Sequence, residues 1–85
     1  MTVRILYFAW LRERLGKAEE ELEPPPGVTT VGELIRWLAD RDEDHAAAFA
    51  NPRVIRAALD RTHVKPDAAI AAAREVAFFP PMTGG

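Results

Sequence analysis

Apolar and polar residues alternate along the chain with two different periods, which separates extended segments from helical ones. Residues 3–9 combine β-branched and aromatic side chains and carry apolar groups on both faces. The alternation divides them into two sets, Val3, Ile5 and Tyr7 on one face and Arg4, Leu6 and Phe8 on the other. This pattern predicts a central strand, covered by helices on one face and partly by a partner protein on the other.

Two helical segments are marked by their own end signals. Residues 10–15 form a short helical pattern, and Gly16 follows where a left-handed residue commonly ends a helix. Thr30 and Glu33 match a capping box, which predicts the start of the main helix. Beyond this start, apolar residues recur at helical spacing and predict one stripe that faces the sheet: Val31, Leu34, Ile35 and Leu38.

The remaining segments predict one further helix and four further strands. Residues 42–50 begin with acidic side chains and are expected to form the helix. Residues 18–23 are acidic and suit an edge strand, although they equally suit a solvated helical turn. Strands are also expected at residues 54–60, 62–64 and 75–79. This order predicts an α+β fold, a mixed sheet of about five strands with helices packed on one face.

The length and composition predict a single domain, residues 1–85. Hydrophobic residues make up 48% of the chain, which is enough to form a core. The net charge of −2 leaves no basic footprint for nucleic acid or an anionic membrane, so neither is expected as a partner. The sequence holds no cysteine, which excludes disulfides, thiolate metal ligands and a cysteine nucleophile. The first residues enter the strand pattern without a basic leader, so we expect a cytoplasmic protein.

No set of residues in the sequence suits a self-sufficient enzyme. His45 and His63 are isolated and are expected to be surface or packing residues, and no metal site is expected. No nucleophile elbow or phosphate-binding glycine loop is present. The acidic run at residues 19–23 is expected to be a solvated edge, with a partner surface as the alternative.

The C-terminal residues carry the most specific signal. Phe78 and Phe79 alternate on the last strand, so one is expected in the core and the other outside. The tail, residues 80–85, starts with two prolines that favour an extended path and ends in two glycines. A terminal glycine has no Cβ, so its carboxylate can enter a narrow channel of another enzyme. The exposed phenylalanine and its neighbours predict an apolar patch for a partner, formed by Phe79, Pro80, Pro81 and Met82 and bordered by Phe8.

This terminal motif resembles that of the small, sulfur carrier subunits of molybdopterin synthases, which are ubiquitin-like proteins. The resemblance extends to Phe8-Ala9 followed by Arg12-Glu13, to the Thr-Val-Gly-Glu-Leu helix start and to the chain length. It implies a β-grasp fold. It also implies that an activating enzyme uses ATP to adenylate the Gly85 carboxylate, which is then converted to a thiocarboxylate. The sulfur would pass to a cyclic pterin phosphate, forming the dithiolene of molybdopterin during molybdenum cofactor biosynthesis.

The resemblance also implies the partners and the residues that meet them. Three partners are expected: a large subunit in a 2:2 heterotetramer, the adenylating enzyme, and a sulfurtransferase or cysteine desulfurase. The large subunit would supply the catalytic groups, and this chain would bind no cofactor itself. Thr83, Gly84 and Gly85 would enter the partner's active site. The partner-binding residues would be Phe8, Arg12, Phe79, Pro80, Pro81 and Met82.

Other functions stay open on the sequence. A sulfur carrier of another pathway, such as thiamine or thiolated tRNA synthesis, shares the Gly-Gly end, and so does a ubiquitin-like protein modifier. A plain interaction domain with a frayed tail is the simplest alternative. The sequence also departs from the family pattern, with residues 72–74 in place of a Gly-Asp turn and Asp60 in place of asparagine. These departures leave the geometry of the turn before the last strand open.

Overall fold

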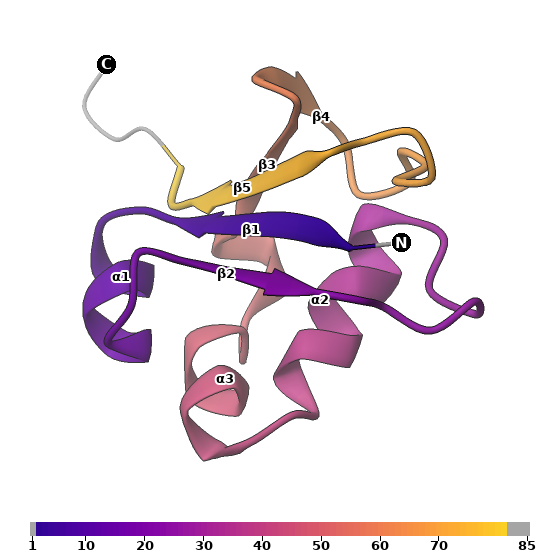
Figure 1. Ribbon diagram of the computed structural model, residues 1–85. Coiled ribbons are helices and arrows are strands. Elements are labelled where there is room, and N and C mark those ends of the chain that lie inside the picture. Colours follow the sequence, from indigo (N-terminus) through magenta and orange to yellow (C-terminus); the bar gives the residue numbers. More distant parts are fainter. Residues whose placement is uncertain (1, 82–85) are drawn as a thin grey trace.

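Five strands form one mixed sheet in the computed structural model, which describes residues 2–81 (Figure 1). The strands are β1 (Val3–Tyr7), β2 (Glu19–Leu22), β3 (Arg56–Leu59), β4 (Thr62–Val64) and β5 (Glu75–Phe79). Their order is β2-β1-β5-β3-β4, in which β1 and β5 are parallel and the other neighbours antiparallel. The first strand is therefore internal and the acidic segment an edge strand, which confirms both predictions.

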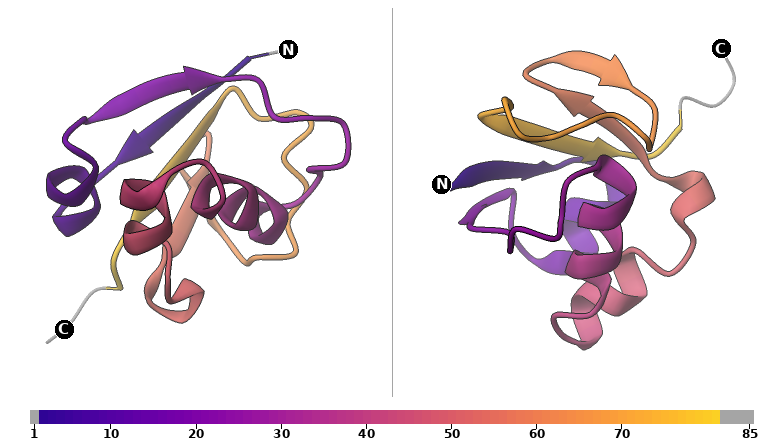
Figure 2. Two further views of the ribbon diagram at one scale, coloured as in Figure 1. Left: turned by 90° about the horizontal axis from the view of Figure 1, so that it is seen from below. Right: turned by 90° about the vertical axis from the view of Figure 1, so that its right-hand side faces the viewer.

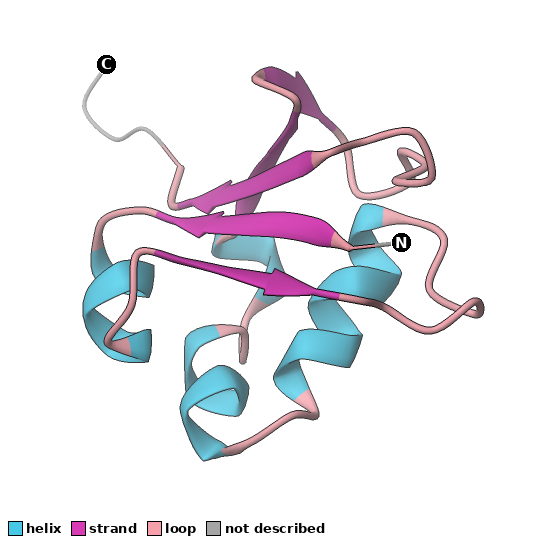
Figure 3. Ribbon diagram, in the orientation of Figure 1, coloured by secondary structure: helices cyan, strands magenta, loops and turns pink. Residues whose placement is uncertain are grey.

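The helices lie on one side of this sheet (Figures 2 and 3). They are α1 (Trp10–Leu15), α2 (Val31–Ala39), α3 (Glu43–Ala48) and the 3-10 turn η1 (Pro52–Val54). Within residues 2–81, none of the helices has the length and apolar character needed to cross a membrane. A five-stranded mixed sheet with one helical layer confirms the predicted α+β fold.

The core fills the space between the helices and the inner face of the sheet, which is the face that carries Ile5, Tyr7, Val76 and Phe78. All four side chains are buried. Phe49, which caps the end of α3, packs edge-to-face on Phe78 with a centroid distance of 5.3 Å and on Tyr7 at 6.2 Å. Aromatic pairs of this kind add about 0.5–1.5 kcal/mol beyond their buried area. The helical layer is thus fixed to the two central strands.

Local end signals place α1 and α2 as predicted. Gly16 adopts a φ of 72°, and its N–H donates to the Arg12 carbonyl, which ends α1. At the start of α2, the Thr30 side chain accepts from the Glu33 N–H at 3.2 Å, and the Glu33 carboxylate accepts from the Thr30 N–H at 3.1 Å. Hydrogen bonds from the Thr29 hydroxyl and the Thr29 and Thr30 amides lower the pKa of Glu33. Both helix ends therefore follow from local chemistry.

The predicted bounds were wrong on either side of η1. Helix α3, predicted over residues 42–50, ends at Ala48 and has Asp42 as its N-cap. The third strand starts at Arg56 rather than Val54, because Pro52 opens the 3-10 turn in between. The Asn51 side chain caps that turn by accepting the Arg53 N–H at 3.2 Å. The first strand ends at Tyr7, two residues earlier than predicted.

Asp60 fixes the turn before β5 that the sequence left open. Its carboxylate accepts the N–H groups of both Arg74 and Glu75 at 3.0 Å. Asp60 and Arg61 take the positive φ values of 47° and 73° in the tight β3–β4 connection. An aspartate tolerates this conformation better than most residues because its short side chain bonds to nearby backbone. The start of β5 is therefore held by a side chain from the β3–β4 turn.

Candidate functional site

The site begins at the end of β5, which lies between β1 and β3 (Figure 1). Phe78 and Phe79 point to opposite faces of the sheet, as the sequence predicts. Phe78 is fully buried on the inner face, whereas Phe79 is half-buried on the outer face. The Phe79 ring lies 5.1 Å from the ring of His63 on β4. Strand β5 is therefore anchored by one phenylalanine and presents the other.

An apolar area, the outer patch, covers the outer face around Phe79. The strand register puts Leu6, Ala77 and Ala58 in one row across β1, β5 and β3. Phe8 extends the patch because its N–H donates to the Phe78 carbonyl at 3.1 Å, which continues the β1–β5 ladder. The patch thus consists of Leu6, Phe8, Ala58, Ala77 and Phe79.

The outer patch is accessible mainly through its aromatic members. The side chain of Phe8 is 48% exposed, the largest exposure among the large hydrophobic residues that the structure describes. Pro80 and Pro81 follow Phe79 and are half-buried. An exposed, contiguous apolar area next to the start of the tail is typical of a protein interface. The structure therefore brings together Phe8, Phe79, Pro80 and Pro81 from the predicted set.

Arg12 lies apart from these residues on α1. It is exposed, and its side chain forms no ion pair or hydrogen bond with any residue in the range 2–81. No contact described for Arg12 joins it to the outer patch. Its predicted role in partner binding stays a prediction. Met82, Thr83, Gly84 and Gly85, also predicted for the site, lie outside the described residues.

A partly buried polar cluster was missed by the sequence reasoning. Glu20 on β2 faces the core, whereas its neighbours Glu19 and Glu21 are exposed. Its carboxylate accepts the Tyr7 hydroxyl at 2.6 Å and lies 3.0 Å from Nε2 of His45. The other ring nitrogen of His45 lies 2.8 Å from Oδ1 of Asp42. The sequence signal for this cluster is the two-residue period of a strand, which puts Glu20 on the same face as the apolar Leu22.

Electrostatics make Glu20 the centre of this cluster. Burial alone would raise the pKa of Glu20, but hydrogen bonds from Tyr7, His45 and Lys17 outweigh it and lower the pKa to about 2. Burial, together with the bond to Glu20, raises the pKa of Tyr7 well above its ordinary value. Lys17 and Arg41 also contact the Glu20 carboxylate, each at 3.3 Å. The cluster ties α3 to β1 and β2.

The cluster is structural rather than part of the outer patch, because it lies on the opposite face of the sheet. His45 is 2% exposed, which confirms its predicted packing role, and His63 is a surface residue whose ring contacts that of Phe79 at a tilt of 45°. Among residues 2–81, no group of three or more His, Asp or Glu side chains could hold a metal ion.

The chain is similar to known proteins over nearly its whole length. The model of the ThiS family matches residues 5–85. A curated relative from Escherichia coli (strain K12), named molybdopterin synthase sulfur carrier subunit, is 34% identical over 83 residues, which cover 98% of this chain and 99% of the relative.

Two solved structures are similar in both fold and sequence. SAMP1 from Haloferax volcanii matches with a TM-score of 0.70 and 25% identity, covering 100% of both chains. A putative molybdopterin converting factor subunit 1 from Pyrococcus furiosus matches with a TM-score of 0.74 and 26% identity, covering 96% of this chain and 99% of that one. These neighbours are consistent with the β-grasp, ubiquitin-like architecture that the sequence predicts.

Proposed function

The chain belongs to the ThiS family, and from this membership we propose that it is the sulfur carrier subunit of a molybdopterin synthase. The name of the curated relative supports this choice within the family, because the match covers nearly the whole of both chains. The similarity to the Pyrococcus furiosus converting factor subunit supports the same function.

One structural observation carries the proposal: β5 ends at the outer patch, directly before the tail. The strand is held on both sides, by β1 and β3, and Phe78 anchors it in the core. A partner that covers Phe8 and Phe79 would therefore receive residues 80–85 from a fixed starting point. Fixing one end of a tail reduces the conformational freedom that its reactive end must lose.

The chemistry takes place at the carboxylate of Gly85. A carboxylate oxygen attacks the α-phosphorus of ATP in the activating enzyme, which releases pyrophosphate and leaves an acyl adenylate. A sulfide sulfur then attacks the acyl carbon, AMP departs and a thiocarboxylate remains. Adenylation is required because AMP is a far better leaving group than an oxide ion. Transfer of the sulfur to the pterin precursor and hydrolysis return the carboxylate.

The partners supply the catalytic groups. The large subunit binds the outer patch and receives Thr83, Gly84 and Gly85 in its active site, in an assembly of two carriers and two large subunits. The activating enzyme recognises the same tail, and a sulfurtransferase or cysteine desulfurase delivers the sulfur. The chain by itself is a carrier and not an enzyme.

A second function is favoured by one comparison. SAMP1 is the small archaeal modifier protein 1 of Haloferax volcanii, and it matches over the full length of both chains. A modifier would use the same activated glycine to acylate a lysine amine of another protein. The two functions share the activation step. They differ in the atom that attacks the activated acyl carbon, a sulfide sulfur in the carrier and a lysine nitrogen in the modifier.

The decisive experiment alters only the end of the chain. We compare the parent with a variant that carries one added alanine after Gly85 and with a variant that lacks Gly85. The parent, incubated with the activating enzyme, ATP and sulfide, should gain about 16 Da as sulfur replaces oxygen. Both variants should fail, since one residue moves the carboxylate by about 3.5 Å, and a misplacement of about 1 Å can cost a hundredfold in rate.

Matched thermal unfolding shows whether the variants keep their fold. An extended variant that gains the mass as readily as the parent, and still supports dithiolene formation, would contradict the proposal. Recovery of the chain with a pterin-binding large subunit supports the carrier, whereas lysine adducts that end in Gly85 support the modifier.

A further inference from the structure

Two cationic residues lie on the outer face of the sheet, next to the outer patch. Arg56 is paired with Phe79 in the β3–β5 register, so these two side chains are neighbours on that face. Ala57 is paired with Val64 in the β3–β4 register, and both point towards the core. The residues that come next, Arg56 and Lys65, therefore stand opposite each other on the outer face, because side chains alternate along a strand. We call Arg56 and Lys65 the cationic flank.

The cationic flank has no charged partner among residues 2–81. Arg56 and Lys65 are exposed, and neither forms an ion pair with any residue in that range. Asp67, two residues after Lys65, forms no ion pair with it. The side-chain hydrogen bond of Arg56 goes from Nη1 to the Arg53 carbonyl at 3.2 Å, which is a neutral acceptor. Like charges that stand opposite each other on neighbouring strands lower stability, so the free chain retains a repulsive contact here.

The acidic residues at the far edge of the outer face lie too far from the cationic flank to neutralise it. Glu19 and Glu21 are exposed on β2, which is three strands away from β3. Strands are spaced by about 4.8 Å, so this separation is about 14 Å, beyond the Debye length of about 8 Å at physiological salt. Glu75 begins β5, at the opposite end of that strand from Phe79. The outer face is thus acidic at β2, apolar in the centre and cationic where the tail begins.

We propose that the large subunit places carboxylates over the cationic flank when it covers the outer patch. A partner that covers Phe79 also removes water from Arg56, because the two side chains are neighbours. Burial of a charge without an opposite charge opposes binding, so the covering surface must supply anions at this position. A guanidinium suits carboxylates in particular, since its N–H groups match the two oxygens. This inference rests on the proposed function, because it takes the large subunit as the partner.

The cationic flank also fixes the orientation in which the partner docks. Contact between apolar surfaces is non-directional, so the outer patch alone permits several rotations of the partner. An ion pair at one side of the patch favours a single rotation and disfavours partners that lack the acidic group. Arg56 stands beside Phe79, and Pro80 follows directly, so the favoured rotation is set at the start of the tail.

Association kinetics test the proposal. The parent chain and the pterin-binding large subunit are mixed in a stopped-flow instrument at about 50 mM salt and at about 500 mM salt, which screens exposed charges. The association rate constant of the parent should fall about tenfold between the two conditions, because electrostatic steering is lost. Thermal unfolding of each chain shows whether it keeps its fold.

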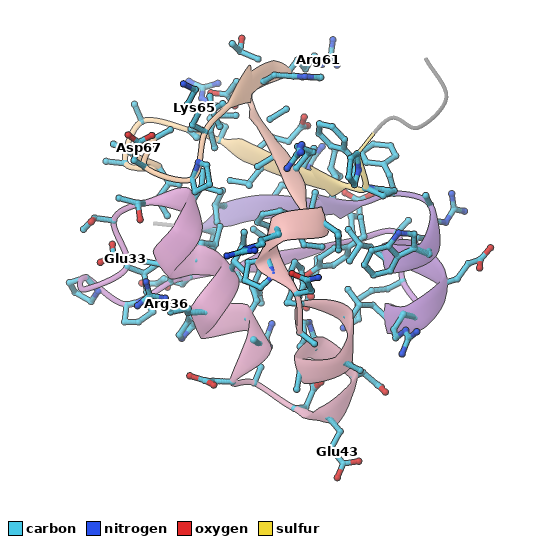
Figure 4. All side chains as sticks on the ribbon, turned by 180° about the vertical axis from the view of Figure 1, so that it is seen from behind. Glu33, Arg36, Glu43, Arg61, Lys65 and Asp67 are labelled. Atoms are coloured by element: carbon cyan, nitrogen blue, oxygen red, sulfur yellow. The ribbon has the colours of Figure 1, made fainter. Side chains whose placement is uncertain are left out.

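Substitutions at Arg56 separate charge from packing. Arg56→Glu should slow association and raise the Kd about fivefold, because an attractive pair is replaced by a repulsive one. It should not lower the melting temperature of the free chain, since the new carboxylate stands opposite Lys65. Arg56→Lys keeps the charge and should bind within about twofold of the parent. Arg36→Glu is the matched control, because Arg36 is exposed on α2, away from Lys65 (Figure 4), and the Kd should stay within about twofold.

Several results would overturn the inference and leave the carrier function in place. Arg56→Glu could bind as tightly as the parent, Arg36→Glu could weaken binding equally, or salt could leave the association rate of the parent unchanged. Slower gain of sulfur by Arg56→Glu, with parental binding to the large subunit, would assign the flank to the activating enzyme. Self-association of the parent that Arg56→Glu abolishes would assign it to a second copy.

Failure of the proposed function itself gives a different result. The parent would then neither gain about 16 Da with the activating enzyme, ATP and sulfide nor bind the large subunit, and the inference would fall with it. A parent that gains the mass but does not bind the large subunit would overturn the inference alone.

Discussion

Truncation of Phe79 to alanine tests the outer patch as the docking surface. The Phe79 side chain is half-buried in the free chain, against His63 at 5.1 Å. Full burial of a phenylalanine contributes about 1.5–3 kcal/mol, so docking can gain about half of that, roughly 1–1.5 kcal/mol, from the exposed part. Truncation of an aromatic anchor at an interface often costs about 2 kcal/mol of binding free energy. Phe79→Ala should therefore raise the Kd for the large subunit about tenfold.

Isothermal titration calorimetry against the large subunit measures this change, and thermal unfolding measures the effect on the fold. The truncation should also cost about 1–2 kcal/mol of stability, from the buried half of the ring and its contact with His63. Val54→Ala is the matched control, because Val54 is 37% exposed and lies outside the patch. It should leave the Kd unchanged.

The comparison of the two variants can refute the reasoning. A folded Phe79→Ala chain that binds within about twofold of the parent would remove Phe79 from the interface, since the expected loss is far larger. Equal weakening by Val54→Ala would show that the effect is not specific to the patch.

Two further predictions concern residues outside the patch. Arg12→Ala should weaken binding of a partner with under about 1 kcal/mol of lost stability, since the side chain is exposed and unpaired among residues 2–81; Arg14→Ala is its control, and a lower melting temperature with unchanged binding would reverse the assignment. Glu20→Gln should lower the free energy of unfolding by about 1 kcal/mol at neutral pH, a value reduced for solvent screening. Glu19→Gln should leave the free energy of unfolding unchanged. Because the Glu20 pKa is lowered from 4.5 to about 2, its contribution to the free energy of unfolding is present above pH 4.5 and lost as the pH falls towards 2. Denaturant unfolding across this range should show that the stability of Glu20→Gln depends less on pH than that of the parent. Equal pH dependence in the two proteins would contradict the role of the cluster.

The sequence by itself determined the features that depend on neighbouring residues. The capping box of Thr30 and Glu33 and the left-handed Gly16 specify helix ends through contacts within one turn. The opposite placement of Phe78 and Phe79 follows from the alternation of side chains along any strand. The Pro-Pro and Gly-Gly signature of the tail led to the family, which the comparisons then established. These signals are local and need no knowledge of the tertiary structure.

Only the tertiary structure decided which distant polar groups meet. Glu20 contacts residues 13 and 25 positions away, and Asp60 bonds to amides 14 and 15 positions away. The apolar pocket lined by Val31 and Ile35 from α2 and by Ile55 and Ala57 from the β3 side likewise exists only once these elements are brought together. Periodicity shows which face a residue occupies, but it does not show what lies opposite that face. Those neighbours are set by strand order and helix packing, because burial of the whole apolar surface is a property of the complete chain.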